Sequence, residues 1–191
     1  MAATVDALIP AQCTRGDARV EPEHAELATQ IQALHSQCFG WALACCGNRR
    51  EDAEDVLQDV YVGVLDNGLR FNGGSTLRTW LFGVIRQKAR SRRRRELLRE
   101  ILGLRNVARI DAPVPSPAPD EDLVRSERAE RTRRALGRLS PRQGEVVRLV
   151  FYHDLTIEEA ANVMKVSLGS ARAHYDRGKK RLAVLLAEER P

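Results

Sequence analysis

The sequence predicts an all-α protein of two small helical domains, and three observations lead to this prediction. Apolar residues recur at three- to four-residue spacing in several segments, and no segment alternates convincingly with period two. Aromatic residues make up only 5% of the chain, so Leu, Val, Ile and Ala must form most of the core, which suits helices. Residues 111–122, DAPVPSPAPDED, hold half of the eight prolines, and alternating prolines forbid a helix.

The Pro-rich segment 111–122 is therefore predicted to be a semi-rigid linker between the domains. Before it we expect a disordered N-terminal tail at residues 1–22 and a first domain at 23–110. After it we expect a second domain at 123–191. No internal repeat is present.

The first domain is predicted to contain three helices, each with one apolar side. The first ends at Gly47-Asn48 and carries Leu27, Ile31, Leu34, Cys38, Trp41 and Cys45. The second ends at Asp66-Asn67-Gly68 and carries Ala53, Val56, Leu57, Val60, Tyr61, Val64 and Leu65. After the loop LRFNGGS, the third buries Leu77, Trp80, Leu81, Val84 and Ile85 and continues into RSRRRRELLRE.

The second domain begins with a charged helix from Leu123 to Leu139. Two capping boxes follow: Ser140-Pro141-Arg142-Gln143, with Pro at the first helical position, and Thr156-Ile157-Glu158-Glu159. Ser167 can cap a last, longer helix. The final two helices are joined by the short turn MKVS, which is typical of a helix-turn-helix unit.

The stretch LTIEEAANVMKVSLGSARAHYDRGKKRL, residues 155–182, is suited to DNA. In a helix-turn-helix unit the second helix enters the major groove and its N-terminal residues meet the base edges. Ala171, Tyr175 and Leu182 are predicted to pack inward, which leaves a polar and basic outer face. That face comprises Ser170, Arg172, Ala173, His174 and Arg177, continued by Lys179, Lys180 and Arg181. Arg reads guanine or pairs with phosphate, and Ser does either more weakly.

An acidic face on the second helix points to a different partner. The stretch REDAEDVLQDVYVGVL places Asp52, Asp55 and Asp59 on one side of a helix, with Gln58 beside them. Such a face repels DNA and fits a basic protein, whereas the run Arg92–Arg95 on the next helix attracts DNA. The first domain is thus expected to hold a protein on one side and nucleic acid on the other.

These segments together resemble a known family. In order and spacing, REDAEDVLQDVYVGVLDN, FNGGSTLRTWLFGVIRQKA and ALGRLSPRQGEVVRLVFYHDLTIEEAANVMKVSLGSARAHYDRGKKRL are similar to regions 2 and 4 of the extracytoplasmic-function sigma factors. These are the small two-domain members of the bacterial sigma-70 family, and the resemblance covers residues from about 27 to 187. It implies a transcription initiation factor whose partners are core RNA polymerase, promoter DNA and an anti-sigma factor.

The resemblance also implies roles for individual residues. Asp52, Asp55, Gln58 and Asp59 would bind the β′ clamp helices of polymerase, which is also contacted at its β flap. The loop Phe71-Asn72-Gly73-Gly74-Ser75 would capture a flipped base of the −10 element, with Gln87 and Arg90 near the melted strand. The helix from Ser167 would read the −35 element, and the linker would thread the RNA-exit path. Three residues depart from the family pattern: Lys165 in the turn, Ala171 and Gly178.

Two other classes of function stay open at this point. An autonomous helix-turn-helix repressor would form a dimer and bind duplex DNA alone. An enzyme or metal protein could use His153-Asp154, or His35 with Cys38, Cys45 and Cys46. The cysteines lack the paired spacing of a zinc site, and Cys38 and Cys45 lie on an apolar stripe, so we expect no metal, no cofactor and no catalysis.

Location and charge complete the prediction. The sequence lacks a membrane-length apolar run and a signal-peptide pattern, so we expect a cytoplasmic protein with reduced thiols. Its formal net charge of +5 is distributed in segregated acidic and basic segments. We also expect the two domains of the free chain to close on each other or on an inhibitor, which would hide the acidic face and the reader helix.

Overall fold

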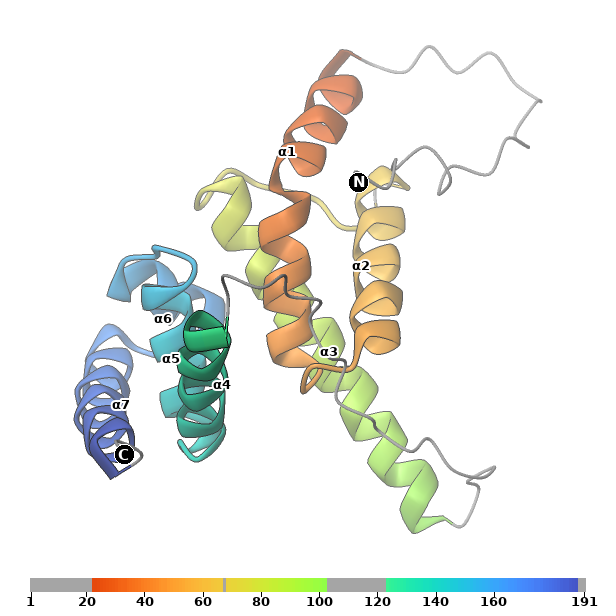
Figure 1. The fold of residues 1–191 in the computed structure, drawn as a ribbon. Helices are drawn as coiled ribbons and strands as arrows, with labels where there is room; N and C mark the ends of the chain where they lie inside the picture. The colour runs from red at the N-terminus through yellow and green to blue at the C-terminus, as the bar shows by residue number, and fades with distance from the viewer. Residues whose placement is uncertain (1–21, 67, 103–122, 189–191) are drawn as a thin grey trace.

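The computed structural model describes residues 22–66, 68–102 and 123–188, which form seven α-helices (Figure 1). The first three are α1 (Pro22–Cys45), α2 (Arg50–Leu65) and α3 (Leu77–Ile101). The other four are α4 (Leu123–Gly137), α5 (Pro141–Phe151), α6 (Ile157–Met164) and α7 (Leu168–Glu188). Over these ranges there is no strand, which confirms the all-α prediction. Of the predicted tail, 1–22, residues 1–21 lie outside the described residues and Pro22 begins α1; the predicted linker, 111–122, also lies outside them.

Helices α1, α2 and α3 pack against one another as a three-helix bundle. Most of its buried apolar side chains are aliphatic, and its two buried aromatic rings, Trp41 and Phe82, stack with their centroids 5.8 Å apart. The indole N–H of Trp41 donates to the carbonyl of Phe82 over 3.0 Å, so the buried ring leaves no unpaired donor. Trp80, predicted to be buried, is only partly covered, and Phe82 takes the central position instead.

A left-handed turn and a helix N-cap set the boundaries of the bundle helices. Gly47 and Asn48 have φ of 67° and 64° and separate α1 from α2. Thr76 is the N-cap of α3, and its hydroxyl accepts from the amide of Thr79 at 3.2 Å. The sequence located both helix boundaries to within a few residues.

Helices α5, α6 and α7 form the core of the second domain, and α4 packs along α7. The capping box at Thr156 and Glu159 is present in full, as predicted. The capping box predicted at Ser140 is wrong, because the Ser140 side chain makes no capping hydrogen bond, although Pro141 does begin the helix. Pro141 alone marks the start of α5, because the fixed φ of proline suits the first turn of a helix.

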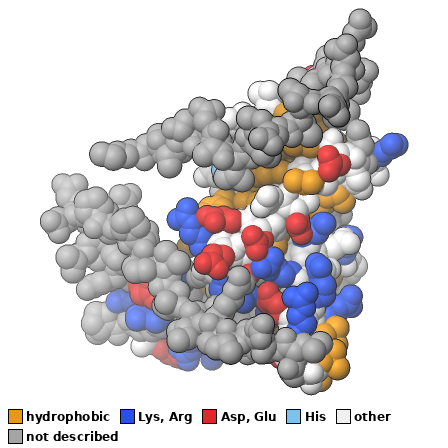
Figure 2. Space-filling view, turned by 90° about the vertical axis from the view of Figure 1, so that its right-hand side faces the viewer, with side chains coloured by type: hydrophobic (Ala, Val, Ile, Leu, Met, Phe, Trp, Pro, Cys, Tyr) orange, Lys and Arg blue, Asp and Glu red, His pale blue; other side chains and the backbone are white. Residues whose placement is uncertain are grey.

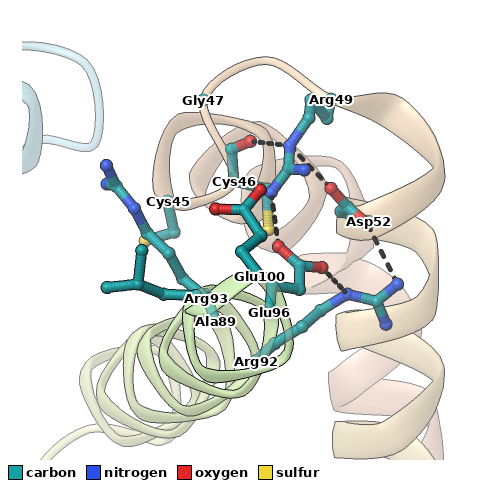
Figure 3. A pocket seen from close by; sticks show the side chains of 11 residues that line it. Cys45, Cys46, Gly47, Arg49, Asp52, Ala89, Arg92, Arg93, Glu96 and Glu100 are labelled. Carbon is teal, nitrogen blue, oxygen red and sulfur yellow. Dashed lines mark hydrogen bonds and ion pairs between the residues drawn. The ribbon is translucent and has the colours of Figure 1, made fainter. Parts of the chain in front are cut away.

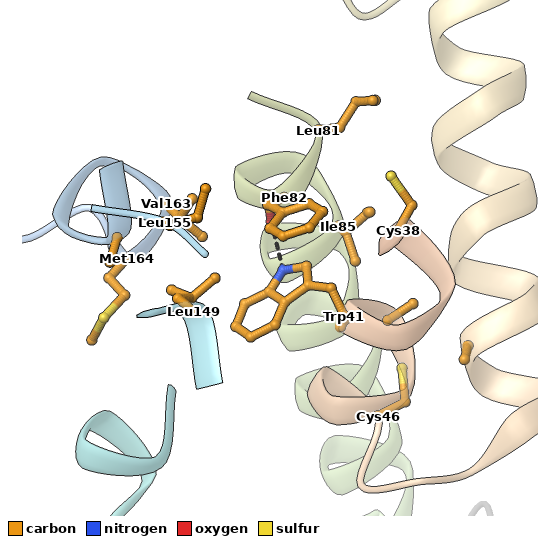
Figure 4. Packing of buried hydrophobic residues seen from close by; sticks show 14 of the residues in the cluster. Cys38, Trp41, Cys46, Leu81, Phe82, Ile85, Leu149, Leu155, Val163 and Met164 are labelled. Atoms are coloured by element: carbon orange, nitrogen blue, oxygen red, sulfur yellow. Dashed lines mark hydrogen bonds between the residues drawn. The ribbon is translucent and has the colours of Figure 1, made fainter. Parts of the chain in front are cut away.

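The two domains are in contact through α3 and α6 (Figure 1). Figure 4 shows Trp41 and Phe82 of the first domain facing Leu149, Leu155 and Val163 of the second. All five side chains are at most 2% exposed, so the apolar core continues across the domain boundary. The described helices include none that is long and apolar enough to span a membrane.

Candidate nucleic-acid and protein interfaces

The exposed side of α2 carries an acidic and an apolar half. Asp55, Gln58 and Asp59 are exposed in the first part of the helix, and Val62 and Leu65 are 49% and 53% exposed toward its end. Figure 2 shows acidic side chains gathered on the face of the molecule that carries α2. Three of the four predicted polymerase-binding residues are therefore accessible. Beside them lie Val62, which was not singled out from the sequence, and Leu65, which was predicted on the apolar side of the helix but is exposed.

Asp52, the fourth, does not belong to this surface. It is 1% exposed and lies between two guanidinium groups: Arg49 Nε at 2.7 Å and Arg92 Nη2 at 3.0 Å (Figure 3). Helical spacing put Asp52 on the same side as Asp55 and Asp59, but α3 covers the first turn of α2. The predicted role of Asp52 in polymerase contact is corrected to a structural one.

Arg92 also departs from its predicted use. It bonds Asp52 and Asp55 on α2, at 3.0 and 2.8 Å, and Glu96 one turn along its own helix at 3.3 Å. Arg93, Arg94 and Arg95 are exposed. The run of four arginines thus offers three side chains to a polyanion, and its first member fastens α3 to α2.

The loop before α3 presents its polar atoms outward. Phe71 packs on Trp80 with the ring centroids 5.5 Å apart, which anchors one end of the loop. Gly73 has φ of 72°, where a Cβ would be strained, and no atom lies within 4 Å of where that Cβ would stand. Asn72 is exposed and its side-chain oxygen accepts from the amide of Gly74 at 3.2 Å. Ser75 is half-buried and donates to the Thr76 carbonyl.

Gln87 and Arg90 lie on α3 at the seam between the domains. Both are exposed, yet Gln87 already has a partner, because Lys165 Nζ donates to its Oε1 over 2.9 Å. A hollow at this seam is lined mainly by polar and basic side chains, from Arg86, Gln87, Arg90, Ser91, Arg94 and Lys165. The structure therefore brings the predicted strand-contacting residues next to the helix-turn-helix unit.

The predicted reader face of α7 is open. Ser170, Arg172, Ala173, Arg177, Lys179 and Lys180 are exposed, and His174 is half-buried. Ser167 caps the helix by accepting from the amide of Ser170 at 3.2 Å, which presents the first turn in a fixed position. Arg177 Nε donates to the Ala173 carbonyl at 3.0 Å, so Arg177 is held along the helix while Arg172 has no such tether.

The three departures from the family pattern have local explanations. Lys165 adopts the left-handed conformation, with φ of 52°, that this turn requires. Ala171 is fully buried, as its inward position predicted. Gly178 is buried against α5, where an added Cβ would lie 3.0 Å from Val147 Cγ2 and 3.3 Å from the Gln143 carbonyl. Gly178 therefore permits a close helix contact, and α7 continues through it without a break.

The residues considered for metal chemistry have structural surroundings. Burial raises the pKa of the Cys38 thiol to about 11, although a hydrogen bond to Tyr61 opposes this. Cys46 has a pKa raised to about 11, again mainly by burial. His35 lies 3.2 Å from the Tyr61 hydroxyl, and the His153 ring meets Trp41 and Phe82 edge-on. Across the described parts of the chain, no cluster of three or more His, Cys, Asp or Glu could hold a metal ion.

Comparison with known families matches both domains. Residues 30–97 match the family "Sigma-70 region 2", and residues 135–183 match "Sigma-70, region 4". The ECF RNA polymerase sigma factor SigX of Bacillus subtilis is 30% identical over 133 residues, 69% of each chain. The matched ranges contain every predicted site residue, and two successive matches in this order oppose the reading as a lone repressor.

Two solved structures share the fold. The sigma factor RpoE of Bartonella quintana, in complex with the anti-sigma factor NepR, aligns with a TM-score of 0.63 at 22% identity, over 86% of this chain and 99% of its own. CnrH in complex with the cytosolic domain of CnrY aligns with a TM-score of 0.60 at 21% identity, over 87% of this chain and 91% of its own. Both alignments span the two domains together.

Proposed function

The chain belongs to the extracytoplasmic-function sigma factors of the sigma-70 family, which direct RNA polymerase to promoters, and we propose that it divides this task among three surfaces. Each surface is made by one or two helices and has its own chemistry. The proposal assigns one surface to polymerase, one to the melted −10 element and one to the duplex −35 element.

The polymerase surface is the exposed side of α2, comprising Asp55, Gln58, Asp59, Val62 and Leu65. The carboxylates suit basic side chains of the β′ clamp helices, and electrostatic complementarity of this kind steers association and sets register. The exposed Val62 and Leu65 add apolar area, which specific interfaces place at their centre. Asp52 takes no part, because Arg49 and Arg92 enclose it.

The −10 surface combines residues 71–75 with Gln87, Arg90 and the exposed arginines of α3. Unpaired bases need accessible hydrogen-bonding groups and backbone that a nucleotide can approach closely, which Asn72 and Gly73 offer. Arg90, Arg93 and Arg94 supply positive charge for the phosphates of the separated strand. Support for this role is the exposure of these groups on one stretch of loop and helix.

The −35 surface is the outer face of α7 from Ser170 to Lys180. Its exposed Arg172 lies in the second turn, where recognition helices meet base edges. Arg177, Lys179 and Lys180 lie further along, where phosphates flank the groove. The β flap of polymerase would contact the same domain away from this face.

Two further parts of the proposal concern regulation and connection. The Pro-rich segment 111–122 would tether the two domains so that binding of one raises the effective concentration of the other. An anti-sigma factor would hold the protein inactive, as the solved complexes of RpoE with NepR and of CnrH with CnrY suggest for related folds. Such a partner would have to cover α2 or α7, since both present exposed binding faces.

The observation that carries the proposal is the separation of an exposed acidic face on α2 from an exposed basic face on α7, because the two helices lie on opposite sides of the molecule (Figure 1). Transcription reconstituted with core polymerase tests it, with the transcript 5′ ends sequenced to reveal the promoters used. We expect new start sites preceded by shared −35 and −10 elements only when the protein is added. Arg172→Ala should relax the preference at one −35 position and cost about 1–3 kcal/mol.

Arg177→Ala is the matched variant, because it removes the same side chain type one and a half turns away. It should weaken binding to all sequences to a similar extent, since phosphate contacts carry no sequence information. Specific duplex binding by a dimer, with no effect on polymerase, would instead support a lone repressor and overturn the proposal.

A further inference from the structure

In the closed chain, in which the two domains are in contact, the acidic face of α2 and the reader face of α7 remain exposed, contrary to the expectation that closure would hide them. A third exposed surface lies at the end of α3, which projects beyond α1 and α2 (Figure 1). It carries four aliphatic side chains that are between 51% and 72% exposed: Leu97, Leu98, Ile101 and Leu102, called the α3 stripe below. None of the three proposed surfaces includes the α3 stripe, and exposed apolar patches mark binding sites.

Exposed arginines border the α3 stripe on both sides. Successive residues of an α-helix are turned by about 100°, so the stripe occupies an arc of about 140° on one side of the helix. By the same spacing Arg93 lies at one edge of this arc, and Arg95 and Arg99 lie at the other. Arg94 precedes the stripe by one turn, and all four arginines are exposed. Figure 2 shows apolar side chains at the lower end of the molecule, where α3 ends, directly below a group of basic ones.

The carboxylates of the same segment lie on the other side of α3. Glu96 and Glu100 follow Arg92 at four-residue spacing, opposite the α3 stripe. Glu96 is bound there by Arg49 at 3.2 Å and by Arg92 at 3.3 Å, and Glu100 lines the same pocket (Figure 3). Within residues 93–102 the apolar side chains are therefore bordered by positive charge, and the negative charge lies behind them.

An anionic membrane fits this arrangement better than a protein or a nucleic acid. A basic amphipathic helix lies in the headgroup region of such a membrane, with aliphatic side chains inserted and arginines beside the lipid phosphates. The α3 stripe lies on a single convex helix end, whereas proteins bind apolar helices in grooves, and it lacks the aromatic residues on which protein interfaces depend. A second copy would bring two sets of arginines together. Nucleic acid would use the arginines and leave the stripe in water.

We propose that residues 93–102 form a peripheral membrane-binding site that takes an anionic phospholipid surface. The α3 stripe inserts between the lipid headgroups, and Arg93, Arg95 and Arg99 bind their phosphates while the aliphatic stems of the arginines lie against the apolar layer. The helix lies along the membrane surface and does not cross it. Arg93 and Arg94 are also proposed to bind the separated promoter strand, so an anionic membrane and single-stranded DNA compete for these two side chains.

The experiment measures co-sedimentation of the full-length protein with lipid vesicles. Vesicles of phosphatidylcholine mixed with phosphatidylglycerol are compared with vesicles of phosphatidylcholine alone. We expect the wild-type protein to bind the anionic vesicles, and to bind the neutral ones about a hundredfold more weakly, because each of three arginines at the surface contributes about fivefold. Single-stranded DNA of mixed sequence should release the protein from the anionic vesicles.

A serine variant separates apolar insertion from attraction between charges. Leu98→Ser combined with Ile101→Ser keeps every charge, and it should weaken binding to anionic vesicles by at least about tenfold, because two apolar side chains no longer leave water. Val184→Ser is the matched control, because it replaces a 48% exposed apolar side chain on α7, and it should bind as the wild type does. Circular dichroism checks that each variant is folded.

Insertion can also be observed directly with a tryptophan in the α3 stripe. The fluorescence of Ile101→Trp should be quenched by anionic vesicles whose acyl chains carry bromine. Val184→Trp places the same reporter on α7 and should show no additional quenching relative to the wild type. The wild-type protein supplies the background, because it already contains Trp41 and Trp80.

A pair of arginine variants tests the charge. Arg95→Gln combined with Arg99→Gln should weaken binding to anionic vesicles by about 25-fold, at about fivefold for each charge, and should not change binding to neutral vesicles. Lys180→Gln combined with Arg181→Gln removes two exposed charges from α7 and should bind anionic vesicles as the wild type does. Equal losses in the two double variants would show attraction by overall charge and would overturn the site on α3.

Equal binding of the wild type and the serine variant to anionic vesicles would also overturn the inference, as would wild-type protein that stays in the supernatant. If the serine variant instead lost self-association in light scattering, or lost affinity for single-stranded DNA, with no vesicle binding by the wild type, the α3 stripe would belong to a second copy or to nucleic acid. Protein that holds DNA and vesicles at once would overturn the competition for Arg93 and Arg94. None of these measurements involves polymerase, whereas failure of the proposed function would be seen as wild-type protein that gives no new start sites.

Discussion

Arg92 Nη2 lies 3.0 Å from Oδ1 of Asp52, and the Asp52 side chain is only 2% exposed. The pair joins the start of α2 to the second half of α3. Breaking a buried ion pair by removing one partner leaves an uncompensated charge, which is more costly than losing the attraction itself. Asp52 therefore belongs to the folding of the first domain rather than to its binding surface.

Asp52→Ala should lower the free energy of unfolding of the first domain by about 1–3 kcal/mol, because Arg49 and Arg92 would both lose a buried partner, although each keeps another carboxylate within 3.3 Å. Urea denaturation followed by circular dichroism measures this. Asp59→Ala, an exposed residue of the same helix, should change the same quantity by no more than about 0.5 kcal/mol. Equal stability of the two variants would return Asp52 to the candidate surface residues.

Asp59→Lys should weaken binding to core polymerase with little change in helix content. Like charges brought together across an interface cost several kcal/mol, and Asp59 is exposed. Asp55 is less suitable for this test, because its reversal would also disturb Arg92, which lies 2.8 Å away. Asp176→Lys makes the same change of charge on α7 and should bind core polymerase normally. The measurement is a competition for core polymerase against labelled wild-type protein.

Replacing Asn72 and Ser75 together by Ala should reduce opening of a duplex promoter, as measured by permanganate reactivity of unpaired thymines. Unpairing and extruding a base costs a few kcal/mol, and these side chains are proposed to offset part of it. A template with a pre-melted bubble should recover part of the lost transcription. Equal losses on both templates would assign the loop to recruitment instead of base capture.

Local patterns predicted most of the helices. The turns at Gly47-Asn48, the cap at Thr76 and the capping box at Thr156 depend on a few neighbouring residues, so they are readable from sequence. The burial of Asp52 could not be predicted from the sequence, because it depends on α3 crossing the first turn of α2. Helical periodicity places a residue on a side of its own helix, but another helix decides whether that side is covered.

The domain seam was also beyond local patterns. Arg86 is buried and pairs with Glu145 of α5, and Phe82, which stacks on Trp41 inside the first domain, also meets His153 of the second domain. Further apolar residues beside the main apolar side of a helix are the sequence signal that could have indicated packing against a second domain. The exposed reader face was predictable, since capping, charge and the inward Ala171 agree on one orientation of α7.

Gly178→Ala should destabilise the second domain, although alanine favours helices over glycine by up to about 1 kcal/mol. The added Cβ would stand 3.3 Å from the Gln143 carbonyl, which is backbone within α5 and has little freedom to move. Gly169→Ala is the matched control, because it lies on the same helix with no atom within 4 Å of the new Cβ. Thermal unfolding should show a lower midpoint for the first variant and an equal or higher one for the second.

The last prediction concerns acid and the closed chain. His153 extends from the second domain to Trp41 and Phe82 of the first, with ring centroids 5.6 and 4.8 Å apart. Its pKa is lowered from 6.5 to about 4, chiefly by burial and also by the charge of Arg78, with Asp154 opposing. Separation of the domains would return the ring to water and its pKa toward 6.5. The open chain therefore binds a proton more readily than the closed chain.

The sign of the effect follows from this difference. Neutral His153 contributes free energy to the contact between the domains. This stabilisation is fully present above about pH 6.5, decreases as the pH falls toward about 4, and changes no further below that pH. At 1.36 kcal/mol per pKa unit the full loss is at most about 3 kcal/mol, and partial solvent access reduces it. We expect the radius of gyration to increase between about pH 7 and pH 5, where most carboxylates are still charged. His153→Gln should abolish most of this increase, whereas His174→Gln, on the reader helix, should retain it. A radius of gyration that rises equally in both variants would assign the acid response to other groups.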